Sequence, residues 1–460
     1  MDTRRLLTII FCLSLLAGTR IFAQTTASGT PSAATGGFSA SAQQQPPGTR
    51  TILLAEAVDL ALKQASNYRA AQFTERIAAE DVRQAKAAFY PKVAAVPTVI
   101  YTTPSLASTL GNIPRPPSFL GANAITEYQA LANTSGEFDT SGKLRAGLRR
   151  SEFLLASARA GTEIARRELI AAVGDAYFVL ALTATKRAGA GKNLANAEEF
   201  ENNIRLQLGA GEVAPVDLVR ARLQTAARRD ELAAAQSDES TAADTLLFLT
   251  GGKSGEAIAT VDLLTMTPVD NEIDNFAETA IRTRPEFAQF DAFAAAARQD
   301  VRSAIADRRP QVTYSVNTGF ISDSLSGSSI KNRFGAQISV GVRFTLFDKG
   351  ISRSQETQAR LRIEQTGNAR QLAERMFVTE FYTARRQAAV AATRIRSIAG
   401  AITDAEQNVI ASTARYRAGE ASIIEVTDAQ NTLIALRQSL YQAIYDYQTA
   451  KLRVMRAAGQ

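Results

Sequence analysis

Hydrophobic residues follow two different periods along this chain. Over 53–93 and 275–312 they recur every three to four positions, which predicts amphipathic helices that end near Pro91 and Pro310. Behind each proline they alternate with polar residues, and this period of two predicts β-strands. The predicted strands are 93–102, 143–149, 312–320 and 334–348, with an irregular loop at 103–137 and Pro97 marking an edge or a bulge. The pattern predicts a mainly helical protein with a small β part.

Two helical segments of unusual length follow the strands. They span roughly 152–208 and 352–418, and at 1.5 Å per residue they would reach roughly 85 and 100 Å. The last helix of the chain carries apolar residues at spacings of three and four, the heptad pattern of helices that pack as a coiled coil. Its seam residues are Val426, Ala429, Leu433, Leu436, Leu440, Ala443, Tyr447, Ala450 and Val454.

The two halves of the chain repeat each other. The segment YRAGEASIIEVTDAQ at 416–430 is similar to LGAGEVAPVDLVRAR at 208–222. The spacing from the turn glycine to the glycine that ends the next helix is equal in both halves, from Gly211 to Gly251 and from Gly419 to Gly459. This agreement predicts an internal duplication, with a first repeat at 51–274 and a second at 275–460.

The first 23 residues resemble a secretory signal peptide. Arg4 and Arg5 precede an apolar run, and Ala23 stands at a plausible cleavage point. A membrane anchor is the alternative, but the run is short for crossing a bilayer. Residues 24–50 are rich in Ser, Thr, Ala, Gly, Gln and Pro, which is typical of a disordered linker. No uninterrupted apolar run of about 18 residues follows, so a membrane-embedded part is expected to be built from strands.

Composition argues against most kinds of catalytic or metal site. The 460 residues include no His and no Trp, and the single cysteine, Cys12, lies in the predicted signal peptide. We therefore predict no enzyme activity, no cofactor and no metal site. The formal net charge of +7 is dispersed among acids, which disfavours nucleic-acid binding. The stretch GGKSGEA at 251–257 lacks the glycine spacing of a phosphate-binding loop.

Four strands per chain imply assembly. Each predicted strand has an apolar face opposite a polar face, the pattern of a transmembrane barrel with lipid outside and water inside. Four strands cannot close a barrel, and open edges are not tolerated in lipid. Other copies of the chain must complete the sheet, and three copies would give twelve strands.

The order of helix, strand hairpin, long helix, glycine turn and helix, present twice, resembles the TolC family of outer membrane efflux and secretion channels. The resemblance covers 51–459 and is carried by AEAVDLAL, AFYPKV, FTLFDKGISRSQ at 344–355 and YRAGEASIIEVTDAQ at 416–430. It implies a homotrimer with one twelve-stranded barrel in the cell outer membrane and a helical tube extending into the periplasm. Such a channel is a passive duct that exports small toxic compounds, drugs, metal ions or proteins, together with a periplasmic adaptor and an inner-membrane pump. A periplasmic coiled-coil adaptor or scaffold without a barrel is the alternative.

The resemblance also implies a gate at the periplasmic tip, where Gly211 and Gly419 would form the two turns. Glu425 and Asp428 match acids that ring the closed constriction of family members. The alternative is that both acids are solvated and complement the helix dipole.

Two further residues match positions that hold the tip closed in the family, Asp217 and Tyr416. Ala421 stands where the family has a basic partner. Arg220, Arg415 and Arg417 are the candidates to replace it.

Overall fold

The computed structural model describes residues 50–64, 66–103, 126–269, 272–276 and 278–459. The predicted signal peptide, the predicted linker up to residue 49 and residues 104–125 of the predicted loop lie outside these ranges and stay predictions.

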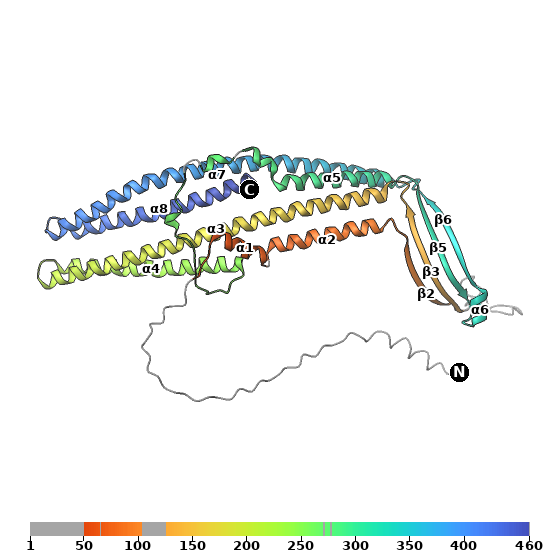
Figure 1. Cartoon of the computed structure of the whole chain (residues 1–460), viewed down its shortest axis with the longest axis horizontal. Coiled ribbons are helices and arrows are strands. Elements are labelled where there is room, and N and C mark those ends of the chain that lie inside the picture. Colours follow the sequence, from red (N-terminus) through yellow and green to blue (C-terminus); the bar gives the residue numbers. More distant parts are fainter. Residues whose placement is uncertain (1–49, 65, 104–125, 270–271, 277, 460) are drawn as a thin grey trace, which may run out of the picture. The chain divides into compact units, whose positions relative to one another are not determined.

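Long helices arranged as two hairpins make up most of the described chain (Figure 1). Helix α3 runs from Lys143 to Gly209 and helix α7 from Ile351 to Arg417, each with 67 residues. They turn back into α4 at Pro215–Thr250 and α8 at Ile423–Ala457. The remaining helices are α1 at Leu54–Lys63, α2 at Asn67–Ala87, α5 at Pro285–Ala306 and α6 at Gly327–Asn332, with 3-10 turns η1 at Leu263–Thr265, η2 at Ile273–Asn275 and η3 at Glu278–Thr283.

A four-stranded antiparallel sheet has the order β2-β3-β5-β6. Its strands are Lys92–Tyr101, Thr126–Phe138, Gln311–Ser322 and Phe334–Arg343. Pro97 pairs with Ala130 in an unbroken register, so the proline marks an edge strand rather than a bulge. Two short strands, β1 at Arg50–Thr51 and β4 at Ile258–Ala259, form a separate parallel pair.

The predicted strand at 143–149 was wrong, because this segment is the start of α3. Asp139 caps the helix, since its carboxylate accepts hydrogen bonds from the backbone N–H of Leu144 at 3.0 Å and of Arg145 at 3.2 Å. The fourth strand is β3, which occupies the end of the predicted loop.

Equal backbone geometry in both halves supports the internal duplication. Positive φ angles occur at Gly142, Gly211 and Gly251, and again 208 positions later at Gly350, Gly419 and Gly459. These glycines begin and end the long helices of each hairpin, where only a residue without a side chain adopts this conformation at little cost. The two halves therefore share one backbone plan.

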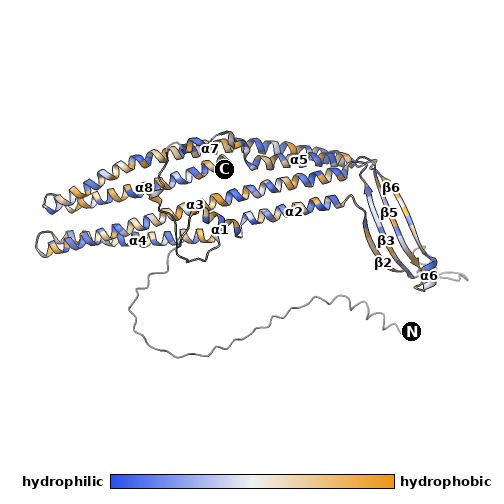
Figure 2. Ribbon diagram, viewed as in Figure 1, coloured by the Kyte–Doolittle hydropathy of each residue, from blue (hydrophilic) through white to orange (hydrophobic). Residues whose placement is uncertain are grey.

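The predicted coiled-coil seam of α8 is largely inside the helical core. Val426, Ala443, Tyr447 and Val454 are fully or almost fully buried, while Leu433, Leu436 and Leu440 are half-buried. Figure 2 shows hydrophobic and hydrophilic residues alternating along the helices, as expected for helices that pack on one side.

Of the described helices, α3 contains a stretch apolar enough by length and composition to cross a membrane. The expectation that no such segment follows the signal peptide was therefore too strict. Half of this stretch is buried, and Val173, Tyr177 and Leu180 belong to the core shared with α1 and α4. The apolar stretch is accounted for by packing inside the helical core.

Candidate gate at the hairpin tips

Each helical hairpin reverses through the same glycine turn. In the first, the N–H of Gly211 donates to the carbonyl of Leu208, and the N–H of Glu212 donates to the carbonyl of Gln207, both at 3.0 Å. The same pattern recurs at Gly419 and Glu420. These paired bonds form a Schellman motif, which satisfies the last carbonyls of a helix and requires the left-handed backbone that glycine provides. Both predicted turn residues thus lie at the tips.

Asp217 and Tyr416 lie close together although they come from different hairpins. Asp217 is in the first turn of α4, while Tyr416 is in the last turn of α7 and its ring lies 6.1 Å from the ring of Phe200 on α3. Burial, and secondly the negative charge of Asp217, raise the pKa of the Tyr416 hydroxyl. That hydroxyl is buried and has no hydrogen-bond partner among the described residues.

A small apolar cluster surrounds Tyr416 and joins the two tips. Its members are Phe200, Ile204, Leu208, Val213, Leu218, Ala221 and Ile423. Because these residues come from α3, α4 and α8, the ring of Tyr416 packs across the boundary between the hairpins. The contact that Tyr416 makes across this boundary is therefore packing of its ring, since its hydroxyl has no hydrogen-bond partner among the described residues.

Glu425 and Asp428 lie on one side of the start of α8. Glu425 is half-buried and forms an ion pair with Arg415 at 2.5 Å, whereas Asp428 is exposed. Arg415 is therefore the arginine that pairs with Glu425 at the second tip. Arg220 lies 4.0 Å from Asp217 in the first tip.

The duplication relates these charges in an informative way. At the shared spacing of 208 positions, Asp217 corresponds to Glu425, and Arg220 corresponds to Asp428. The first tip carries an acid and a base where the second carries two acids. At these two positions, only the second tip carries two carboxylates, and carboxylates close together attract cations.

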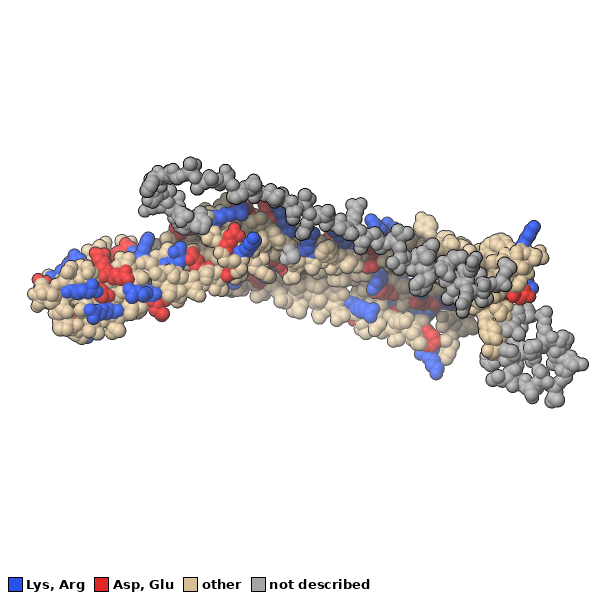
Figure 3. Space-filling view, turned by 90° about the horizontal axis from the view of Figure 1, so that it is seen from below, with Lys and Arg blue, Asp and Glu red and all other residues tan. Residues whose placement is uncertain are grey.

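A cavity of about 200 Å³ separates the hairpins just behind the tips. The side chain of Gln224 on α4 donates to Gln430 on α8 at 3.0 Å, and Arg228 donates to Asn431 nearby. The cavity is lined mainly by amides and arginines. No group of three or more Asp, Glu, Cys or His side chains within the described residues is placed to hold a metal ion. Figure 3 shows acidic and basic side chains interspersed over the visible face, without a basic patch.

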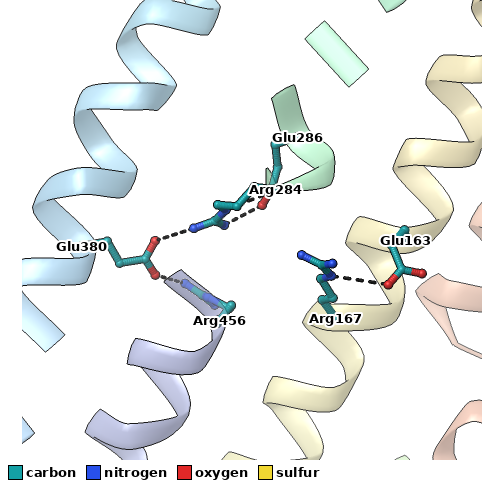
Figure 4. Close-up of polar contacts among 6 residues, drawn as sticks. All are labelled: Glu163, Arg167, Arg284, Glu286, Glu380 and Arg456. Atoms are coloured by element: carbon teal, nitrogen blue, oxygen red, sulfur yellow. Dashed lines mark hydrogen bonds and ion pairs between the residues drawn. The ribbon is translucent and has the colours of Figure 1, made fainter. Parts of the chain in front are cut away.

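A buried ionic network, which the sequence did not reveal, joins three helices of the second repeat (Figure 4). Arg284, at the start of α5, is 6% exposed and makes two hydrogen bonds to the carboxylate of Glu286. It also lies 3.5 Å from Glu380 on α7, which in turn pairs with Arg456 on α8. Its guanidinium stacks 3.7 Å from the centre of the Phe377 ring.

The first repeat has no equivalent of this network. The positions that correspond to Glu286, Glu380 and Arg456 are Asn67, Ala172 and Phe248. A possible sequence signal was the Arg-Pro-Glu triplet at 284–286, but its partners are far away along the chain.

Comparisons with known proteins agree on one family. The sequence profile of the family described as outer membrane efflux protein matches residues 57–252 and 277–460. Outer membrane protein TolC of Escherichia coli (strain K12) is 27% identical over 173 residues, which is 35% of this chain and 35% of that protein. The chain thus spans about a third of the length of this relative in the alignment.

Solved structures share the fold. The CmeC outer membrane channel of Campylobacter jejuni has a TM-score of 0.78 at 17% identity, covering 88% of this chain and 85% of that chain. The outer membrane protein VceC of Vibrio cholerae has a TM-score of 0.74 at 21% identity, covering 88% and 96%.

Proposed function

Because this chain belongs to the outer membrane efflux protein family, we propose that it is the outer membrane channel of a tripartite efflux or type I secretion system. Three copies form a passive duct whose helices extend into the periplasm and whose strands close a twelve-stranded barrel. A periplasmic adaptor and an inner-membrane pump supply the substrate and the energy. The cargo is a small toxic compound or a protein.

The exposed apolar face of the edge strands is the observation that carries this proposal. On β6, Ile338 is 74% exposed and Val340 is 68% exposed, and on β2, Val99 is 66% exposed. A contiguous apolar face of this kind is a liability in water and suits the lipid side of a barrel. A periplasmic scaffold has no need of such a face, so the channel is favoured over that alternative.

The gate is proposed to lie at the hairpin tips. In a trimer, Glu425 and Asp428 would bring six carboxylates around the constriction. Like charges at short distance attract cations and disfavour full ionisation. The closed duct should therefore conduct poorly and prefer cations.

Single-channel recording in planar bilayers tests the channel and its gate together. The wild type should give small, cation-preferring openings, and Glu425→Ala/Asp428→Ala should enlarge them or abolish the preference. A channel that is indifferent to the double change would move the gate elsewhere. Failure to insert or conduct under any condition would overturn the channel itself.

The closure of the tip has its own test. Asp217→Ala should open the tip, because Asp217 lies beside Tyr416 at the boundary between the hairpins and matches a family residue that helps to hold the tip closed. Cells that carry the variant should then become leaky to dyes and large antibiotics. Unchanged leakage would remove Asp217 from the gate without affecting the duct.

A further inference from the structure

The four-stranded sheet ends in two unpaired edges. Every residue of β6 and all but one residue of β2 are exposed, whereas the central strands β3 and β5 are mostly half-buried. An unpaired edge presents a row of free backbone N–H and C=O groups, and these must be paired inside a bilayer. If the proposed function holds, each edge needs another strand, and the duplication indicates which residues that strand brings.

The duplication relates the strands of the two hairpins by fixed offsets. Pro91 and Pro310, just before β2 and β5, are 219 positions apart, while the glycines that begin α3 and α7 after β3 and β6 are 208 apart. The strand pairing obeys the same offsets. Lys92 pairs with Ser135 in the first hairpin, and the residues 219 and 208 positions later, Gln311 and Arg343, pair in the second. The offsets therefore predict register correctly where it is observed.

The junction between β3 and β5 is where the first repeat meets the second within one chain. Ala132 pairs with Thr318 there, and Ala130 pairs with Phe320. In a closed ring, the second repeat must meet the first repeat of the next copy in the same way. Adding 208 to the number of a β3 residue gives its counterpart in β6. Subtracting 219 from the number of a β5 residue gives its counterpart in β2.

We propose that β6 of one copy pairs antiparallel with β2 of the next copy in the register that this conversion defines. Val340 then faces Val99 of the next copy, and Ile338 faces Tyr101. Val342 faces Pro97, and beyond the end of β6 at Arg343 the same spacing extends to the pairs Phe344 with Ala95 and Leu346 with Val93. All five pairs are apolar on both strands, which continues the outward apolar face of the sheet across the junction without interruption.

Other registers are less favourable. Because side chains alternate along a strand, a slip of one residue would place the apolar side chains of β2 on the same side of the sheet as the polar side chains of β6. A slip of two residues preserves the faces but shifts each chain relative to its neighbour by more than 6 Å, since a strand rises about 3.4 Å per residue. The long helices that follow the strands would be displaced with it. The register from the duplication keeps the helices of all copies level.

Disulfide cross-linking tests this register directly. The starting protein carries Cys12→Ser, so the introduced cysteines are the only ones. Directly opposite residues of antiparallel strands have Cα atoms about 4.5–5.5 Å apart, within disulfide range, whereas diagonal neighbours are about 7–8 Å apart. The matched pair is Val99→Cys with Val340→Cys, and the shifted controls place the second cysteine at Pro97 or Tyr101 instead of Val99. The intrachain positive control is Ala132→Cys with Thr318→Cys, since these residues are paired in one chain.

After oxidation of outer-membrane fractions, the matched pair should give a covalent trimer on denaturing gels, and reduction should return it to monomer. The shifted pairs should remain monomeric after denaturation. Stronger cross-linking by a shifted pair would overturn the register and identify the correct one. No cross-link in any pair, with trimers still present before denaturation, would show that β6 and β2 do not meet while leaving the channel intact. Absence of any trimer in the wild type would overturn the proposed function as well.

Discussion

The buried network around Arg284 should be a main stabilising feature of the second repeat, and Arg284→Met tests this. The substitution keeps an unbranched apolar side chain over the ring of Phe377 but removes the guanidinium. Glu286, whose side chain is 19% exposed, then loses its ion-pair partner. Glu380 still has Arg456. The dominant change is therefore at Glu286, a half-buried carboxylate that loses its ion pair and two hydrogen bonds and keeps only the charge of Arg167 acting on it.

Removing one partner of a buried ion pair typically costs about 3–5 kcal/mol of stability. Because Glu380 remains paired, we expect the lower end, about 3 kcal/mol, for Arg284→Met. Arg284→Met/Glu286→Gln also removes the stranded charge and should recover about half of that loss or more. The control is Arg282→Met, an exposed neighbour, which should change stability by less than about 0.5 kcal/mol.

The same network gives a pH signature. Burial alone would raise the pKa of Glu286, but the hydrogen bonds and the charge of Arg284 outweigh it, so the pKa lies below its ordinary value. A lowered folded-state pKa stabilises the protein above the ordinary pKa, and this stability is lost as the pH falls through the folded-state value. The difference in free energy of unfolding between the wild type and Arg284→Met should be largest at neutral pH and should shrink below about pH 4.

Denaturant unfolding of the purified protein in detergent, followed by helical circular dichroism at several pH values, measures these differences. If Arg284→Met is as stable as Arg282→Met, the guanidinium of Arg284 does not stabilise the second repeat and the explanation is refuted. It is equally refuted if the double variant is less stable than the single one, because the stranded charge would then not be the cause.

Three smaller changes have expected outcomes that follow from single contacts. Gly319→Ala should abolish heat-stable trimers, because its φ is +150° and a Cβ would lie 1.9 Å from the carbonyl oxygen of Ala130, whereas Gly341→Ala has 3.6 Å to its nearest neighbour and should be tolerated. Gly419→Ala should lower the free energy of unfolding by about 1–2 kcal/mol, because only its positive φ opposes a side chain. Gly400→Ala inside α7 should raise the free energy of unfolding by about 0.5–1 kcal/mol. A Cβ would meet no atom within 4 Å at either site, and chemical denaturation compares the two variants. Tyr416→Phe should leave dye leakage and stability unchanged or slightly improved, because the buried hydroxyl has no hydrogen-bond partner among the described residues; leakage equal to that of Asp217→Ala would contradict this.

Periodicity made the long helices and three of the four strands of the sheet, β2, β5 and β6, predictable. The apolar spacing of α8 and the alternation of β6 follow directly from one face being buried or facing lipid. Strand β3 was missed because Ala130, Ala132, Thr134 and Gly136 give it a weak apolar face. The segment 143–149 misled because Leu144 and Leu148 fit a helix, at a spacing of four, as well as a strand. The Asp139 cap, three residues before Gly142 at the start of the helix, was the better signal.

The candidate gate was predictable only through the family resemblance, since isolated acids near a helix start carry no specific signal. Sequence reasoning named Arg220, Arg415 and Arg417 as candidates to replace the basic partner missing at Ala421, and that role stays a prediction. Within one chain, Arg415 pairs with Glu425 and Arg220 lies near Asp217. The Arg284 network was beyond reach, because Glu380 and Arg456 are 96 and 172 positions away from Arg284. Contacts of this kind depend on how three helices pack, and no local pattern specifies that.

The two repeats keep one backbone and differ in charge, and this difference decides what a ring of tips would present. Backbone equality gives six similar hairpin ends in a trimer, so geometry alone would give near six-fold symmetry. The charges break this six-fold symmetry. Asp217 of the first tip has Arg220 beside it, whereas the corresponding residues of the second tip, Glu425 and Asp428, are both acids. Arg415 already compensates Glu425. Asp428 has no ion pair among the described residues, so of the six carboxylates proposed for the closed ring, the three of Asp428 are expected to contribute most to its cation preference.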